Sequence, residues 1–179
     1  MRKVLVIGSP GAGKSTLGKA LARLTGLPLY HLDALYWKPN WAKTPNAEWD
    51  ELLRRLVAEP AWIIDGNYGR TLDIRIQAAD TVILLDKPRL LCEWRVIKRR
   101  VTAIGRVRSD MGDDCVERLL VDREFVAFLR FIWNFPKASG IEGKLRRLAG
   151  EGSGKRIIRL RSDREAAAYL AQLRQEGGH

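Results

Sequence analysis

The chain has 179 residues, of which 46% are hydrophobic and 30% are charged, and its formal net charge is +11. A chain of this size buries roughly 70% of its unfolded surface on folding, which excludes a largely disordered protein. The strongly apolar runs, Val4–Ile7 and Val82–Leu85, are far shorter than the roughly 20 residues of a membrane-spanning helix. We therefore expect one cytoplasmic domain over residues 1–179, with no membrane segment.

The positive charge is concentrated in two segments of the chain. Residues 89–108 and residues 144–161 each contain seven basic residues and one acid, so each segment contributes +6, and the other 141 residues sum to −1. Such basic segments occur in proteins that bind nucleic acids or phosphates. The sequence has no helix-turn-helix spacing and no zinc-finger motif, so the charge alone does not favour DNA.

Short apolar runs alternate with segments of helical periodicity along the chain. Strands are predicted at residues 3–7, 28–32, 62–65, 81–86 and 156–160. Helices are predicted to begin near Lys14, Asn46, Pro88, Cys115, Ile141 and Asp163, and Pro136 is expected to close the fourth of them. This alternation favours an α/β fold in three layers, with a mostly parallel sheet covered by helices on both faces.

A glycine-rich loop follows the first predicted strand. It reads Gly8, Ser9, Pro10, Gly11, Ala12, Gly13, Lys14 and Ser15, which matches the pattern G-x-x-x-x-G-K-[ST] between a strand and a helix. The glycines let backbone N–H groups surround a phosphate chain, and Lys14 supplies a cation for the β and γ oxygens. The Ser15 hydroxyl is placed for Mg²⁺ and Thr16 for the α-phosphate. The loop predicts that a nucleoside triphosphate and Mg²⁺ are the ligands.

Two aspartates end predicted strands at the same edge of the sheet. Asp65 follows the run 62–64, where a carboxylate is placed to hold Mg²⁺, although it could also be a turn residue before Gly66. Asp33 follows the second strand, where it could accept the proton of an acceptor hydroxyl, or simply cap a turn. His31 is interpreted as a hydrogen-bonded strand residue rather than a general base.

The helix predicted over residues 89–101 has two different faces. Leu90, Trp94, Ile97 and Val101 recur at the spacing of a buried stripe, and Arg95, Lys98 and Arg99 lie on the opposite side. We expect the apolar stripe to pack, and the arginines of the basic face could close over transferred phosphates or could form an ordinary solvated face.

An aromatic segment, residues 36–41, follows the Asp33 strand. Its tyrosine and tryptophans, including Trp37, could stack against a base or another planar acceptor, or could pack among themselves. Both interpretations remain open at this stage.

Taken together, the phosphate loop, the Asp-Gly turn after the third strand and the basic run near residue 98 resemble the adenylate-kinase-like branch of P-loop kinases. More narrowly, residues 31–39, 62–68 and 88–100 are similar to the bacterial family of DNA topology modulation proteins. The resemblance implies a five-stranded sheet of order 2-3-1-4-5, a short helical lid over about residues 98–118, and in-line phosphoryl transfer from ATP.

The resemblance also implies roles for individual arginines. Arg95 would stack near the donor base, Arg99 would reach the phosphates, and Arg70 would hold the acceptor after the Asp-Gly turn. Arg106 and Arg108 would act from the lid, with Arg108 and Arg99 joining Lys14 and Asp33 in catalysis.

Two classes of function follow from these observations. The first is a phosphotransferase that moves the ATP γ-phosphate to a small acceptor, for which Asp33, Trp37 and Arg70 are the candidate binding residues. The second is a DNA-associated protein controlled by nucleotide binding. The acceptor and the oligomeric state stay open.

Overall fold

The central sheet is built as the alternation of strands and helices predicts. In the computed structural model, which describes residues 1–104, 123–150 and 154–176, five parallel strands pair in the order β2-β5-β1-β6-β7. The strands are β1 (Lys3–Gly8), β2 (Leu29–His31), β5 (Trp62–Asp65), β6 (Thr81–Leu85) and β7 (Arg156–Leu160). Counted along the chain, this is the expected order 2-3-1-4-5, so the fold prediction is confirmed.

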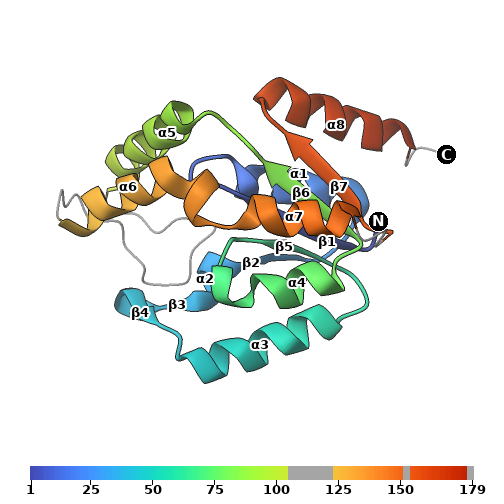
Figure 1. Cartoon of the computed structure of the whole chain (residues 1–179), viewed down its shortest axis with the longest axis horizontal. Helices are drawn as coiled ribbons and strands as arrows, with labels where there is room; N and C mark the ends of the chain where they lie inside the picture. The colour runs from blue at the N-terminus through green and yellow to red at the C-terminus, as the bar shows by residue number, and fades with distance from the viewer. Residues whose placement is uncertain (105–122, 151–153, 177–179) are drawn as a thin grey trace.

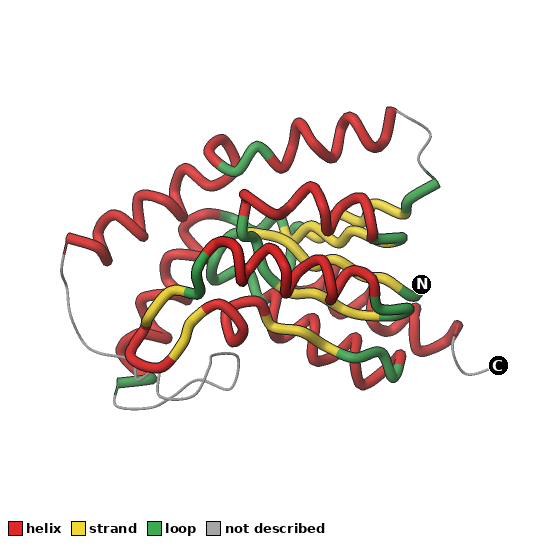
Figure 2. Tube along the Cα trace, turned by 90° about the horizontal axis from the view of Figure 1, so that it is seen from below, coloured by secondary structure: helices red, strands yellow, loops and turns green. Residues whose placement is uncertain are grey.

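Helices cover both faces of the sheet, because successive side chains of a buried strand point in opposite directions. In β1, Leu5 and Ile7 contribute to one apolar core, whereas Val4 and Val6 contribute to the other. Figure 2 shows the strands running between helices that lie above and below them. The helices are α1 (Lys14–Thr25), α2 (Leu32–Tyr36), α3 (Asn46–Ala58), α4 (Leu72–Ala78), α5 (Arg89–Thr102), α6 (Arg123–Ala138), α7 (Ile141–Gly150) and α8 (Asp163–Glu176). None of them is long and apolar enough to cross a membrane.

The core on one side of the sheet receives side chains from α3, α4 and α7, and the core on the other side receives them from α1, α5 and α8. The helix α6 contributes to both cores, Phe135 to the first and Ile132 to the second. Figure 1 shows α7 in front of the strands and α1 behind them, with α4 and then α3 below. Because all five strands are parallel, their carboxyl ends share one edge, and the loops after β1, β2 and β5 meet there.

Several short elements were not predicted from the sequence. The chain forms α2 immediately after β2, and then a small antiparallel hairpin of β3 (Trp37–Lys38) and β4 (Ala42–Lys43) around the 3₁₀ turn η1 (Pro39–Trp41). Another 3₁₀ turn, η2 (Gly69–Thr71), precedes α4. The prediction that Pro136 closes a helix is wrong by two residues, since α6 continues to Ala138. The expected start of that helix near Cys115 lies outside the described residues.

The predicted buried stripe of α5 is on the surface instead. Its members are 71% (Leu90), 61% (Trp94), 38% (Ile97) and 55% (Val101) exposed. The helix buries Cys92 and Val96. These smaller side chains let the α5 backbone approach the phosphate loop closely, as described below, and the bulky stripe could not. The stripe prediction was therefore wrong about which apolar face packs.

Candidate functional site

The phosphate loop joins β1 to α1 and shows the expected backbone geometry. Gly13 caps the N-terminus of α1 in the left-handed conformation, with φ of 96°. Lys14 begins the helix, and its Nζ donates to the carbonyl oxygens of Gly8 at 3.0 Å and Ser9 at 3.2 Å. Its ammonium group therefore lies over the loop, where the phosphates of a nucleotide would be held by backbone N–H groups and the helix terminus.

Gly11 can be nothing but glycine in this arrangement. Its φ is +82°, and a Cβ placed there would lie 2.3 Å from the carbonyl oxygen of Cys92 in α5. The loop thus rests directly against the α5 backbone. Burial raises the pKa of the Cys92 thiol, so this side chain behaves as a small core residue rather than a reactive thiolate.

A pocket of about 840 Å³ opens over the phosphate loop. It brings together most of the residues that the sequence nominated. Those that line it are Pro10, Gly11, Gly13, Lys14, Ser15, Thr16, Asp33, Trp37, Asp65, Arg95 and Arg99. Gly8, Ser9 and Ala12 lie outside this lining, at the base of the loop, and Ala12 is buried. Arg106 and Arg108 and most of the predicted lid, from residue 105 to residue 118, lie outside the described residues.

Ser15 and Asp65, the predicted Mg²⁺ ligands, face this pocket from α1 and β5. Their hydroxyl and carboxylate groups are oxygen donors of the kind that Mg²⁺ prefers, and a site with one or two protein ligands plus phosphates is typical of this ion. His31 Nδ1 lies 2.9 Å from Asp65 Oδ2, so the histidine holds the carboxylate from the neighbouring strand. The donor set fits Mg²⁺, and His31 is the hydrogen-bonded strand residue that we expected.

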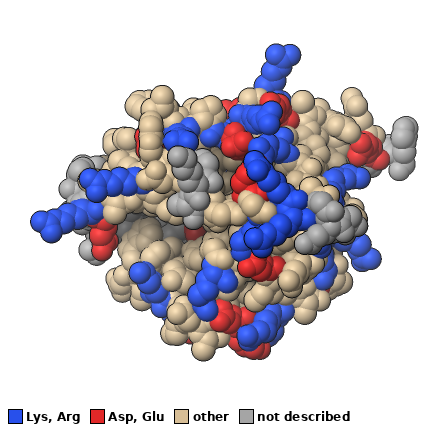
Figure 3. All heavy atoms as spheres, in the orientation of Figure 1, with Lys and Arg blue, Asp and Glu red and all other residues tan. Residues whose placement is uncertain are grey.

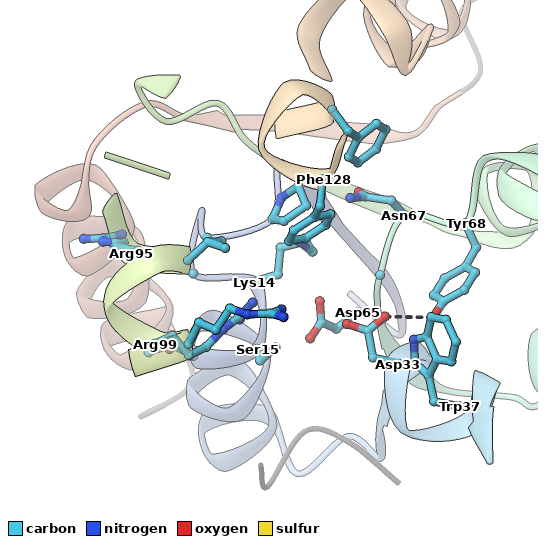
Figure 4. Close-up of a pocket in the computed structure, with 18 of the residues that line it drawn as sticks. Lys14, Ser15, Asp33, Trp37, Asp65, Asn67, Tyr68, Arg95, Arg99 and Phe128 are labelled. Carbon is cyan, nitrogen blue, oxygen red and sulfur yellow. Dashed lines mark hydrogen bonds between the residues drawn. The ribbon is translucent and has the colours of Figure 1, made fainter. Parts of the chain in front are cut away.

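Asp33 lies in the first turn of α2, at the opposite side of the pocket from the phosphate loop. The hydroxyl of Tyr68 donates to its Oδ1 at 2.8 Å. Burial and the Asp33 carboxylate together raise the pKa of Tyr68 far above its usual range, so the tyrosine remains a donor at neutral pH. Figure 4 shows the Asp33 and Asp65 carboxylates between Lys14 and Arg99 on one side and Trp37 and Tyr68 on the other.

Besides Tyr68, sequence reasoning missed two residues that build this side of the pocket. Asn67 lines the pocket and accepts from the Gly8 N–H at 3.2 Å while donating to the Gly8 carbonyl at 2.8 Å, which ties the loop after β5 to the phosphate loop. Arg75 of α4 is fully buried. Its guanidinium donates to the carbonyl groups of Gly66, Asn67 and Tyr68.

Arg75 stabilises a strained backbone at this loop. Tyr68 has φ of 34°, a left-handed conformation that is unfavourable for a bulky side chain. The bonds from Arg75 hold that carbonyl and its neighbours in place, and burial lowers the pKa of the guanidinium to about 10, which still leaves it charged at neutral pH. No local pattern marks Arg75 in the sequence, because its partners are backbone carbonyls seven to nine residues away.

The predicted arginines are placed differently from one another. Arg70 does not line the pocket: its guanidinium donates to both carboxylate oxygens of Asp50 in α3, at 2.9 and 2.6 Å. Arg95 borders the pocket, but it is ion-paired with Asp163 at the start of α8. Bonds from Arg95 and from Lys87 hold the pKa of Asp163 below its usual range.

Among the predicted arginines that the structure describes, Arg99 points into the pocket. It lines the pocket from α5, one turn after Arg95, and Figure 4 shows its guanidinium pointing toward the side of Asp65. We name the phosphate loop with Arg95 and Arg99 the donor wall. We name Asp33, Trp37, Trp41, Asn67 and Tyr68 the acceptor wall.

The chain matches no protein-family model and no curated protein. Solved structures match it over nearly its whole length. A gluconokinase from Sinorhizobium meliloti 1021 is 17% identical, with a TM-score of 0.53 over 98% of this chain and 94% of that one. A shikimate kinase from Acinetobacter baumannii, in complex with shikimate, is 15% identical, with a TM-score of 0.57 over 98% of this chain and 92% of that one. At these identities the likeness shows that the chain has a P-loop kinase fold.

Proposed function

We propose that the protein is an ATP-dependent phosphotransferase that moves the γ-phosphate of ATP to a hydroxyl group of a small molecule. The observation that carries the proposal is the pocket itself. It has a volume of about 840 Å³, and the phosphate loop and the Asp33 carboxylate lie on opposite sides of it. A carboxylate opposite a phosphate loop is the arrangement that phosphoryl transfer to a hydroxyl requires.

Different residues of the chain have different roles in this reaction. Lys14 and Arg99 neutralise charge on the transferred phosphoryl group, and Asp33 accepts the proton of the attacking hydroxyl. The new bond joins the acceptor oxygen to the γ phosphorus, and the bond from that phosphorus to the bridging oxygen of ADP breaks. Ser15 and Asp65 would hold Mg²⁺, which would supply positive charge to the phosphates of the bound nucleotide.

DNA association, the other function considered, receives less support. Several charges of the basic segment 144–161 are satisfied inside the molecule, since Lys144 pairs with Asp73 and Arg159 with Glu142. Lys155 donates to the carbonyls of Gln77 and Ala79, each at 2.7 Å. Figure 3 shows acidic side chains interleaved with the basic ones on the face that carries α7.

A substitution at Lys14 tests the phosphotransferase proposal. Lys14→Ala should reduce ATP-dependent ADP release by about 100-fold or more, because it removes a cation from the transferred phosphate. Lys144→Ala is the matched control, since Lys144 lies on α7 outside the pocket lining and pairs with Asp73. If both variants, folded by circular dichroism, release ADP at the wild-type rate, the proposal fails.

A further inference from the structure

The two walls of the pocket carry opposite chemical characters. The basic side chains that line the pocket come from the phosphate loop, α1 and α5, and they are Lys14, Lys19, Arg95, Arg99 and Arg100. The segments that follow β2 and β5 contribute the Asp33 carboxylate and aromatic rings instead, namely those of Trp37, Trp41 and Tyr68. The cationic end suits a triphosphate, and the other end presents negative charge and ring faces to the acceptor.

In the described part of the chain, no basic side chain from the segments after β2 and β5 reaches the pocket. Arg70 is held by Asp50 and by the Asn46 carbonyl at 3.1 Å, outside the lining. Arg75 is buried behind the loop, with its donors turned to backbone carbonyls. An acceptor bearing a carboxylate or phosphate would therefore meet Asp33 with no cation of this wall to offset the repulsion.

The tryptophans of the acceptor wall are fixed in position. The rings of Trp37 and Trp41 pack edge to face with centroids 5.6 Å apart, and Tyr36 supports Trp37 from behind at 5.2 Å. Asn40 and Trp41 both have φ of 60°. Left-handed backbone costs energy for a ring-bearing residue, so the turn η1 holds Trp41 at the pocket against its local preference.

Resting on the phosphotransferase function above, we propose that the acceptor is an uncharged or cationic alcohol with a planar ring. Its ring stacks on Trp37 or Trp41, and its hydroxyl donates to Asp33, which takes the proton as the oxygen–phosphorus bond forms. A positive charge on the acceptor is favoured by the Asp33 carboxylate and by the tryptophan faces. Sugar acids, cyclic hydroxy acids and nucleoside monophosphates are disfavoured by the Asp33 carboxylate.

Three groups of acceptors that differ in charge test the proposal by acceptor-stimulated ADP release. The neutral group is the common nucleosides, the anionic group is their 5′-monophosphates with gluconate and shikimate, and the cationic group is aromatic amino alcohols such as 2-amino-1-phenylethanol. We expect a neutral or cationic compound to raise the rate of ADP release at least about tenfold over ATP alone. This factor corresponds to the free energy of stacking one ring on an aromatic side chain. The anions should leave it unchanged.

The outcomes separate this proposal from the function on which it rests. Stimulation by an anion but by no neutral or cationic compound overturns the acceptor class and leaves the phosphotransferase standing. If ATP binds but no compound of the three groups stimulates ADP release, the result contradicts both the acceptor class and the phosphotransferase function.

A pair of tryptophan variants tests the placement of the acceptor. With the best acceptor of that screen, Trp41→Ala should raise KM about tenfold or more and leave the Kd of ATP unchanged, because one stacking face is lost. Trp94→Ala is the matched control, since Trp94 is 61% exposed on α5 and does not line the pocket. Trp37→Ala is measured beside them, and equal KM values for Trp37→Ala, Trp41→Ala and Trp94→Ala would place the acceptor elsewhere.

Discussion

The donor wall and the acceptor wall face the same pocket, yet they are built in different ways. The centre of the donor wall is one continuous loop between β1 and α1, whose backbone N–H groups and lysine suit any nucleoside triphosphate. The acceptor wall gathers side chains from α2, the β3–β4 hairpin and the loop after β5. In the proposed function, the nucleotide would be recognised by backbone geometry and charge, whereas the acceptor would be recognised by side chains that tertiary structure must assemble.

The acceptor wall depends on one buried arginine, and removing it should have the largest effect. Arg75→Met leaves buried carbonyls without donors, so we expect the free energy of unfolding to fall by about 3 kcal/mol or more. Urea denaturation measures this free energy of unfolding. Arg70→Met is the matched control, because its ion pair with Asp50 is half exposed and should be worth about 1 kcal/mol or less. Similar losses for both variants would contradict the role assigned to Arg75.

The donor wall should instead be most sensitive to changes that strain its backbone. Gly11→Ala places a Cβ against the Cys92 carbonyl in a left-handed conformation, and strain of this kind should weaken Mg·ATP binding by about 10- to 100-fold. Isothermal titration calorimetry gives the Kd. Gly143→Ala in α7 is the control, since its Cβ meets nothing within 4 Å, and its Kd should match wild type. Wild-type affinity in Gly11→Ala would show that the loop can move away from α5.

The smallest of the three effects concerns the two apolar faces of α5. Val96→Ala should lower the free energy of unfolding by about 2 kcal/mol, because Val96 is buried against the donor wall. The same substitution at Val101, which is 55% exposed, should stay within about 0.5 kcal/mol. Thermal or urea unfolding measures both losses. A larger loss for Val101→Ala than for Val96→Ala would mean that the stripe predicted from the sequence is the face that packs.

What could be predicted from the sequence was encoded locally. The five strands and the loop from Gly8 to Ser15 each depend on a few consecutive residues, and the strand order followed from a resemblance carried by such segments. The β3–β4 hairpin escaped prediction because two-residue strands are too short to show alternation. The α5 stripe was misassigned because periodicity reveals an apolar face without revealing what packs against it.

The unpredicted parts of the site depend on contacts between distant segments. Asn67 is hydrogen-bonded to Gly8, which lies 59 residues away, and Arg75 donates to carbonyls of a preceding loop. Neither role could be predicted from the residue type or its neighbours in the sequence. Arg70 was expected at the acceptor because of its place after the Asp-Gly turn. The structure pairs it with Asp50, because the turn η2 directs its guanidinium toward α3.

The most direct test of the account is single-turnover transfer from γ-labelled ATP by Asp33→Asn. The amide oxygen can still accept the Tyr68 hydroxyl bond, so the geometry of the acceptor wall should persist while the proton acceptor is lost. We predict that transfer to the best acceptor slows by about 100-fold or more and that the Kd of Mg·ATP stays at the wild-type value. Transfer at the wild-type rate, or a loss that follows loss of ATP binding, would contradict the division of the pocket into a donor wall and an acceptor wall.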